Sequence, residues 1–456
     1  MRIRLESMVA LVAALALAMT FVPALRVAAQ AQSLPTGPVA IDVWWWGETE
    51  APGSQKWLEA AEAAYSKQHP NVTFNNNLLS TDALLPTLEA AGKAKQGPTI
   101  MYLWGGIYTM DAVWKGWLTP ISDLVGMDEA KHYINKQEAT WDGKIWSAAW
   151  YLQPSYPIVY NKAAFTAAGL DPANPPKTWD DFLAACDAFH AKGMPLVGLG
   201  VKDTWGAGRF WMDSLVQQID GVGPVLKTVT GEASFTDKPY VDFFAAWKQM
   251  TDHKCFPDDV ASLEMYPGQQ LVPQGKAGLT FITGSELASY IKAIGADKTG
   301  VMKLPPTGDG VYKDQLGSTS QTLAVANWAS DDQKAVAADF IKFLHTPEQL
   351  TAYYATTGVP PADDRFDPNA IDNPLVRQVY DWATQNPAPE IENYVPYDIA
   401  FNGFNTAQVQ IVTGQIASAA DAAAFTQSVA DKWRQSNRLL LERYKQWAQQ
   451  KAAAGA

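Results

Sequence analysis

Two tryptophans end apolar runs of the chain immediately before glycine, a placement that suits ligand binding. Trp46 ends the run IDVWWW before Gly47, and Trp104 ends the run IMYLW before Gly105. Such runs are typical of strands, and open α/β sheets bind ligands beyond the carboxyl ends of their strands. An indole covers the apolar face of a sugar ring, while carboxylates and amides bond its hydroxyl groups. We therefore predict a sugar site that includes Trp46, Trp104, Gly105 and the neighbouring Glu48.

Two later segments carry a similar mixture of aromatic, acidic and amide side chains. They read KDTWGAGRFWMD in the middle of the chain and YDIAFNGF near its end. The candidate ligand contacts in them are Asp203, Trp205, Arg209 and Trp211 in the first, and Tyr397, Phe401, Asn402 and Phe404 in the second. Trp211 follows a helical pattern that also suits a core residue, and Arg209 has the alternative of pairing with a carboxylate on a helix.

The three consecutive tryptophans are expected to have different surroundings. Successive side chains of a strand point to opposite faces of the sheet. We expect Trp44 and Trp45 to pack between the sheet and its helices, and only Trp46 to leave the sheet and form one wall of a cleft. Trp205 or Trp211 is expected on the opposite wall.

The elements that position the first tryptophans follow a regular order. Residues 40–46, 71–76 and 98–104 read as strands, and residues 54–69 and 81–97 between them follow the helical period. This βαβαβ order predicts a mainly parallel sheet flanked by helices on both faces.

A second α/β domain is predicted in the middle of the chain. Residues 177–193 form a predicted helix that begins with a capping box of Thr178 and Asp181. Residues 194–200 then read as a strand, and KAGLTFITGSE reads as another strand-to-helix turn with Ser285 as its N-cap.

The amino terminus has the pattern of a secretory signal peptide, predicted over residues 1–31. Arg2 and Arg4 precede an apolar run that is too short for a membrane helix, and Ala29-Gln30-Ala31 fits a cleavage site. We expect an exported protein, periplasmic or extracellular, that is soluble after cleavage. The formal charge of −12 argues against nucleic acid and anionic membranes as partners.

Cysteine and histidine usage limits the chemistry further. In an exported chain the only two cysteines, Cys186 and Cys255, are a candidate disulfide, with two buried free thiols as the alternative. The five histidines have no metal-ligand spacing, so we expect neither a metal nor any other cofactor.

Two other function classes are considered. A secreted glycoside hydrolase needs two facing carboxylates, for which Glu48 and Glu286 are the candidates. A binder of a phosphorylated polyol or another anionic ligand needs several basic groups, and Arg209 is the only obvious one. No serine-nucleophile, phosphate-loop or zinc-protease motif occurs, so we predict a binding protein without catalytic residues.

Several segments resemble one known family. They are VWWWG, GPTIMYLWGG, LTFITGSE with GVMKLPP, and, most specifically, YPIVYNKAAFTAAGLDPANPPKTWDDFLAACDAFHAKG and AADFIKFLHTPEQLTAYYATTGVPPA. With them the chain resembles the family 1 extracellular solute-binding proteins of carbohydrate ABC importers, which are maltose-binding-protein-like. The likeness covers nearly the whole chain after the predicted signal peptide.

The resemblance implies a type II periplasmic-binding-protein fold of two α/β lobes joined by hinge strands, in which each lobe is a mainly parallel sheet flanked by helices. The implied first lobe holds residues 36–150 and 310–357, and the second holds residues 151–309 and 358–450. A neutral mono- or oligosaccharide would bind between the lobes, with Gly284 and Glu286 of the TGSE segment among its contacts. The other implied partners are the permease subunits of an importer, and the protein is expected to be a monomer without a lipid anchor.

Overall fold

The computed structural model describes residues 33–454, apart from the side chains of residue 82 and residues 211–213. The predicted signal peptide, residues 1–31, lies outside the described residues. From Pro35 onward the chain forms one compact unit. Within the described part, no helix combines the length and the apolar character that crossing a bilayer requires.

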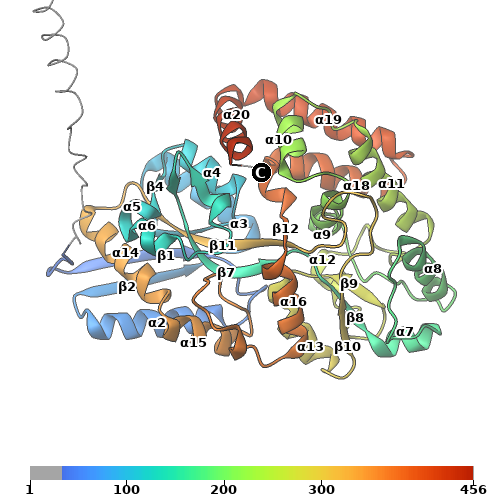
Figure 1. The fold of residues 1–456 in the computed structure, drawn as a ribbon, viewed down its shortest axis with the longest axis horizontal. Helices are drawn as coiled ribbons and strands as arrows, with labels where there is room; N and C mark the ends of the chain where they lie inside the picture. Colours follow the sequence, from blue (N-terminus) through green and yellow to red (C-terminus); the bar gives the residue numbers. More distant parts are fainter. Residues whose placement is uncertain (1–32, 455–456) are drawn as a thin grey trace, which may run out of the picture. The chain divides into compact units, whose positions relative to one another are not determined.

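Within residues 33–454, a mixed sheet of seven strands holds the tryptophan run (Figure 1). β1 pairs in parallel with β2 and β3, as the βαβαβ order predicts. β11 runs antiparallel to β3, β4 and β7, because it joins the sheet from a late part of the chain. The strands are β1 (Val39–Trp45), β2 (Val72–Leu78), β3 (Ile100–Leu103), β4 (Leu118–Thr119), β7 (Ala148–Pro154), β11 (Gly317–Ala326) and β12 (Ala388–Pro389).

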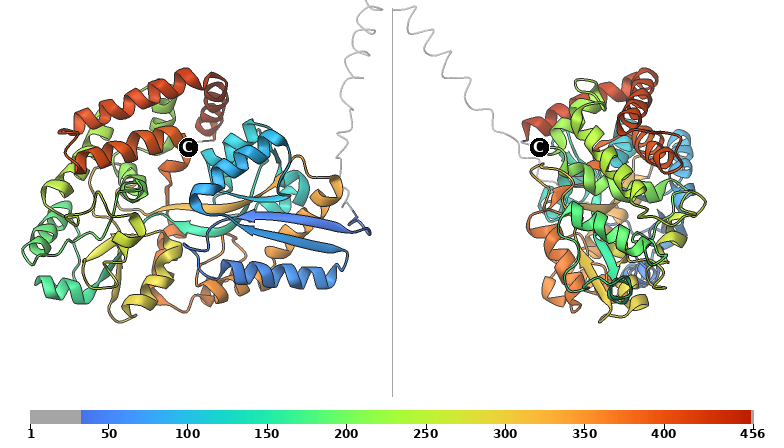
Figure 2. Two further views of the ribbon diagram at one scale, coloured as in Figure 1. Left: turned by 180° about the vertical axis from the view of Figure 1, so that it is seen from behind. Right: turned by 90° about the vertical axis from the view of Figure 1, so that its right-hand side faces the viewer.

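Helices cover both faces of this larger sheet. α2 and α15 lie on one side and α3 and α4 on the other, as Figures 1 and 2 show. The period of α2 turns Trp57, Leu58 and Tyr65 toward the core, where all three are buried. The helices of this part are α2 (Ser54–Gln68), α3 (Thr81–Ala94), α4 (Ile107–Trp114), α5 (Ile121–Val125), α6 (Met127–Ala130), α14 (Asp331–Leu344) and α15 (Pro347–Thr357).

The tryptophan run follows the strand alternation only in part. Trp45 is completely buried, as expected, but Trp44 is only half-buried. The reason is that one face of β1, with Val39, Ile41 and Val43, is fully covered, while the opposite face is covered less.

A smaller sheet of three strands lies in the middle of the chain, within the described residues. β8 (Ile158–Asn161) pairs antiparallel with both β9 (Leu279–Phe281) and β10 (Thr299–Met302), which differs from the mainly parallel sheet expected for a second lobe. We propose that the two lobes follow the two sheets.

The helices after the smaller sheet's first strand carry most of the later site residues. α20 lies beside α10, with α19 next to it (Figure 2). These helices are α7 (Lys162–Ala168), α8 (Trp179–His190), α9 (Trp205–Ser214), α10 (Val222–Thr230), α11 (Lys238–Asp252), α12 (Met265–Gln269), α13 (Leu287–Ile294), α16 (Pro374–Gln385), α17 (Tyr397–Ile399), α18 (Thr406–Val412), α19 (Ala419–Ser436) and α20 (Arg438–Ala453).

Residues 194–200 do not form the predicted strand. Their backbone amides donate to different parts of the chain rather than to one neighbouring strand. The amide of Val197 donates to the carbonyl of Cys255, and that of Gly198 donates to the carbonyl of Leu279. Only an isolated bridge joins Val197 to Leu279. The glycine at position 200 lies against the backbone at Leu263, where a Cβ atom would come within 2.3 Å, so the segment packs as an irregular chain.

Of the two N-caps predicted from the sequence, one is correct and one is wrong. The capping box of Thr178 and Asp181 begins α8, as predicted. The N-cap of the short 3-10 helix η3 (Gly284–Glu286) is Thr283 rather than Ser285, because Thr283 and Glu286 form the reciprocal pair.

A disulfide joins Cys186 on α8 to Cys255, which follows α11, with Cα atoms 4.7 Å apart. The bond closes a segment of 69 residues. Closing so long a loop restricts the unfolded chain, which is the main source of disulfide stabilisation.

We expect a Cys186→Ala and Cys255→Ala double variant to lose about 2–4 kcal/mol of unfolding free energy. The measurement is urea unfolding of both proteins without reductant. The wild-type protein in reductant is the control and should match the variant. An unchanged midpoint would show that the bond does not stabilise the fold.

Candidate functional site

A cavity of about 350 Å³, here the inner chamber, lies beyond the carboxyl ends of β1 and β3. Its walls come from β7 and β11 of the larger sheet, from helices such as α9 and α12, and from the segments between elements. The lining residues are Trp46, Glu50, Thr81, Trp104, Gly105, Tyr108, Gln153, Tyr156, Asp203, Trp205, Arg209, Glu264, Met265, Tyr266, Thr319, Gln321, Glu390, Glu392 and Asn393. A cavity of this size admits a small sugar-sized ligand.

Trp46 and Trp104 lie together on one wall of the inner chamber. Their ring centroids are 5.4 Å apart at an interplanar angle of 61°, an edge-to-face contact. The indole nitrogen of Trp46 donates to the hydroxyl of Thr81 over 2.8 Å. Trp46 is also in contact with Tyr102, so it is fixed from behind and only 6% exposed. The wall is therefore a rigid aromatic surface.

Gly105 lines the chamber, and close packing also explains why a glycine occupies this position. A Cβ atom at this position would lie 2.7 Å from a carboxylate oxygen of the buried Glu138. That oxygen accepts hydrogen bonds from Thr319 and Asn393, two residues that line the chamber. Burial raises the pKa of Glu138 to about 7. Glu138 thus holds two wall residues from outside the cavity.

Arg209 on α9 forms the electrostatic centre of the chamber. Its Nη2 donates to Glu50 over 3.0 Å and lies 3.5 Å from the carboxylate of Glu286. Its Nε donates to the sulfur of Met265, and its guanidinium lies over the ring of Tyr156. Burial raises the pKa of Glu50, although the charge of Arg209 opposes that change. The two carboxylates share one buried cation.

Acidic groups dominate among the charged side chains of the lining. The carboxylates that line the chamber are Glu50, Asp203, Glu264, Glu390 and Glu392. Arg209 is the only basic side chain among the lining residues that the structure describes. Glu392 accepts a hydrogen bond from Tyr108 over 2.9 Å, and burial raises its pKa to about 7. Such a lining can accept hydrogen bonds from hydroxyl groups and repels anions.

Glu48 does not face the chamber, which corrects the sequence-based expectation. Its two carboxylate oxygens accept hydrogen bonds from the backbone amides of Gly53 and Gln55, at the start of α2. The turn after Gly47 instead brings Glu50 into the cavity, because the amide of Glu50 bonds the carbonyl of Gly47. The amino terminus of α2 therefore takes the carboxylate of Glu48, a favourable place for a negative charge.

Three further candidates also lie elsewhere. Phe404 is completely buried and stacks on Phe244 in the core. Asn402 is exposed and donates to Asp398. The cause is the π-helical segment η6 (Ala400–Asn405), whose wider turn changes which residues face inward. Gly284 packs against the ring of Pro154, where a Cβ atom would come within 2.5 Å.

The remaining candidates divide between two cavities. Asp203, Trp205 and Arg209 line the inner chamber, and Glu286 supports it through Arg209. The side chain of Trp211 lies outside the described residues.

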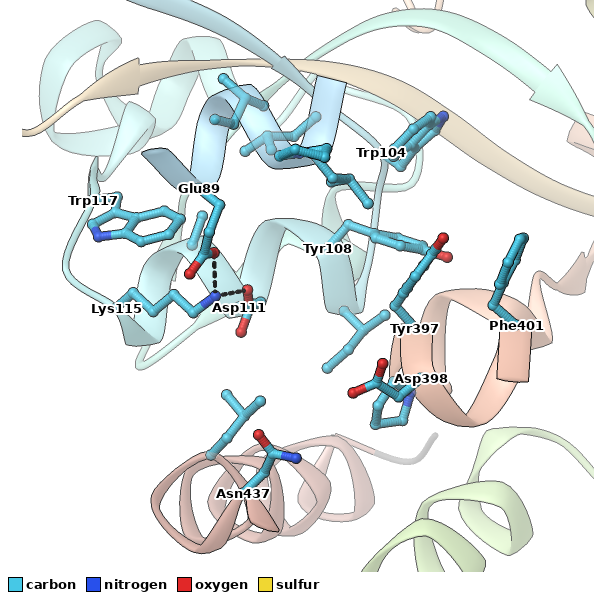
Figure 3. A pocket seen from close by; sticks show the side chains of 18 of the residues that line it. Glu89, Trp104, Tyr108, Asp111, Lys115, Trp117, Tyr397, Asp398, Phe401 and Asn437 are labelled. Carbon is cyan, nitrogen blue, oxygen red and sulfur yellow. Dashed lines mark hydrogen bonds and ion pairs between the residues drawn. The ribbon is translucent and has the colours of Figure 1, made fainter. Parts of the chain in front are cut away.

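Tyr397 and Phe401 line a second cavity of about 490 Å³, here the outer chamber (Figure 3). Their rings stack with centroids 5.1 Å apart, and Phe401 contacts Trp205 at 5.0 Å. The two chambers share Thr81, Trp104, Tyr108 and Trp205 as lining residues.

Sequence reasoning missed the polar strand residues of the site. Gln153 on β7 and Gln321 on β11 line the inner chamber and hydrogen-bond each other. Both lie in strands whose neighbouring side chains are buried. A glutamine inside such a strand is the signal that could have identified them, since buried polar groups need a partner or a ligand.

The comparisons with known proteins identify the family. The model of the bacterial extracellular solute-binding protein family matches residues 47–351, about two-thirds of the chain. The chain therefore belongs to this family.

Solved structures confirm the two-lobe type II fold class. A chitin oligosaccharide binding protein superposes with a TM-score of 0.76 at 21% identity, covering 87% of this chain and 98% of that one. The GacH receptor of Streptomyces glaucescens, solved unliganded and with acarbose, has a TM-score of 0.68 at 18% identity, covering 89% and 99%. At these identities the likeness concerns the fold alone.

Curated relatives match shorter stretches. An uncharacterized ABC transporter extracellular-binding protein of Pyrococcus horikoshii is 29% identical over 180 residues, 38% of this chain and 41% of that protein. An sn-glycerol-3-phosphate-binding periplasmic protein of Agrobacterium fabrum is 34% identical over 130 residues, 25% and 28% respectively. The chain thus matches less than half the length of these relatives.

Protonation of Glu392 should make stability depend on pH. Its folded pKa of about 7 exceeds the ordinary glutamate value, so its contribution is complete at acidic pH and is lost as pH rises toward 7 and above. We expect Glu392→Gln, which cannot ionise, to lack this loss. The unfolding free energy of the variant, minus that of the wild type, should therefore increase from pH 4 to pH 8.

Urea midpoints of both proteins at several pH values measure this effect. Glu442→Gln, at an exposed position paired with Lys445, is the matched control and should follow the wild-type profile. Parallel profiles for wild type and Glu392→Gln would contradict the assignment.

Proposed function

We propose that the protein captures a neutral sugar in the inner chamber and delivers it to the permease subunits of an ABC importer. The observation that carries the proposal is the lining, in which Trp46 and Trp104 stand beside carboxylates and the amides of Gln321 and Asn393. Aromatic faces suit the C–H face of a sugar ring, and the acceptors suit its hydroxyl belt. The family and its sugar-binding structural relatives support the same conclusion.

This role requires an exported protein, and the family is by description extracellular. We propose residence in the periplasm or outside the cell after removal of residues 1–31, and action as a monomer. A thermal-shift screen against a panel of ligands would identify the sugar and its length.

We propose binding rather than catalysis. The two carboxylates that a hydrolase would need, Glu48 and Glu286, have different structural roles. Glu48 caps α2, and Glu286 caps η3 and pairs with Arg209. An anionic ligand is less suited than a neutral one, because Arg209 already serves two carboxylates and the other charged lining groups are acidic. The sn-glycerol-3-phosphate ligand of some relatives is thus the alternative to exclude by experiment.

A thermal-shift screen with neutral sugars, polyols and sn-glycerol 3-phosphate tests the proposal, because a bound ligand stabilises the native state. A rise in Tm with one neutral sugar supports it. A rise with sn-glycerol 3-phosphate alone, or release of nitrophenol from nitrophenyl glycosides, would replace it with the anionic or hydrolytic alternative.

The tryptophan wall gives a direct mutational prediction. We expect Trp46→Ala to weaken binding of the identified sugar by on the order of 1–3 kcal/mol, because it removes the stacking surface. It should also lower stability, since Trp46 is largely buried. Trp45→Ala should cost about 3–5 kcal/mol of stability, because that side chain is completely buried in the core.

Titration calorimetry and urea unfolding of both variants separate the two effects. Trp45 does not line the chamber, so its variant serves as a packing control. Normal binding by Trp46→Ala would mean that Trp46 is an ordinary core residue.

The salt response distinguishes neutral from charged ligands. A neutral sugar forms no charge pair on binding, so its affinity should change little when sodium chloride is added. The measurement is the dissociation constant in low and high salt at one pH. A steep loss of affinity would indicate an anionic ligand instead.

A further inference from the structure

The outer chamber adjoins the inner chamber, with which it shares four lining residues. Trp104 and Trp205 stand at the junction, since each lines both cavities. A group that is attached to a ligand seated against Trp46 and extends past these two rings would enter a space of about 490 Å³.

The two chambers differ in chemistry. The charged groups of the outer chamber are largely bonded to each other: Lys115 binds Glu89 over 2.8 Å and Asp111 over 2.6 Å. Figure 3 shows this ion cluster on the side of Trp117, away from Tyr397 and Phe401.

Three other polar groups of the outer chamber also have partners. Asn437 donates to the carbonyl of Trp433, Asp398 accepts from Asn402, and Thr81 accepts from Trp46. What the outer chamber offers a ligand is therefore mainly aromatic and aliphatic surface.

The apolar part of the lining comes from elements on both sides of the cavity. Leu85 lies on α3 and Leu440 lies on α20. The stacked rings of Tyr397 and Phe401 come from the segment that begins with α17. Leu85 and Leu440 are each partly exposed to solvent, so an apolar ligand group would cover surface that is otherwise wet.

We infer that the natural ligand is a glycoside whose sugar lies in the inner chamber and whose apolar aglycone, an aromatic or aliphatic group, lies in the outer chamber. This inference rests on the proposed sugar-binding function and specifies its ligand class. A second sugar ring would have to compete for polar groups that already have partners within the chain, whereas an apolar group gains free energy from burial alone.

The test uses matched ligands of the sugar ring that the thermal-shift screen selects: its methyl glycoside, its phenyl glycoside and its disaccharide. We expect the phenyl glycoside to bind about tenfold more tightly than the methyl glycoside, and more tightly than the disaccharide. Titration calorimetry of the full chain measures all three affinities.

Two variants locate the effect. Leu440→Asn should reduce the phenyl-to-methyl affinity ratio toward one, because it makes the wall of the outer chamber polar. Leu439→Asn is the matched control: the neighbouring side chain is 88% exposed and lines neither chamber, so the ratio should stay at the wild-type value. Unfolding midpoints of both variants verify that they are folded.

Three outcomes would overturn the inference. Equal affinities for the phenyl and methyl glycosides, or tightest binding of the disaccharide, would refute the apolar aglycone while leaving sugar binding intact. A ratio that is unchanged by Leu440→Asn would place the phenyl group elsewhere. Failure of every sugar and glycoside to bind would overturn the proposed function itself.

Discussion

The buried ion pair between Arg209 and Glu50 is the interaction on which the site depends. Glu50 follows β1 of the larger sheet, whereas Arg209 and its second partner, Glu286, lie beside the smaller sheet. The pair therefore joins the two parts of the chain at the floor of the inner chamber. Removing one partner of such a pair leaves an unpaired buried charge, a change that typically costs about 3–5 kcal/mol. A ligand in the inner chamber would thus lie over a contact that the fold cannot easily give up.

The chamber walls are supported from behind in a similar way. Glu138 accepts hydrogen bonds from Thr319 and Asn393, and Thr81 accepts one from Trp46. These bonds fix wall residues before any ligand arrives, which lowers the entropic cost of binding. For the proposed sugar, selectivity would then come from shape and from fixed acceptors, and much less from side chains that reorder around the ligand.

Sequence reasoning succeeded where the signal was local and failed where it depended on tertiary contacts. The strand alternation and the following glycine indicated the place of Trp46, and the capping box predicted the start of α8. Glu48 was a candidate from the sequence and Glu50 was not considered, because nothing local reveals that the helix α2 uses the carboxylate of Glu48. Asn402 was misplaced because a π-helical turn changes the period by which faces are assigned. The fold class was predictable because the family motifs span most of the chain.

The arrangement of the larger sheet has a consequence for how the chain folds. β11 pairs with β3 and β7, yet the whole smaller sheet and helices α7 to α13 lie between β7 and β11 in the chain. β12, still later in the chain, completes the far edge. Pairings between such distant segments carry a large loop-closure entropy and slow the rate-limiting step. β3 therefore lacks its partner β11 until most of the polypeptide has been synthesised. This delay would leave time for a transport machinery to pass an extended chain across a membrane before the sheet closes.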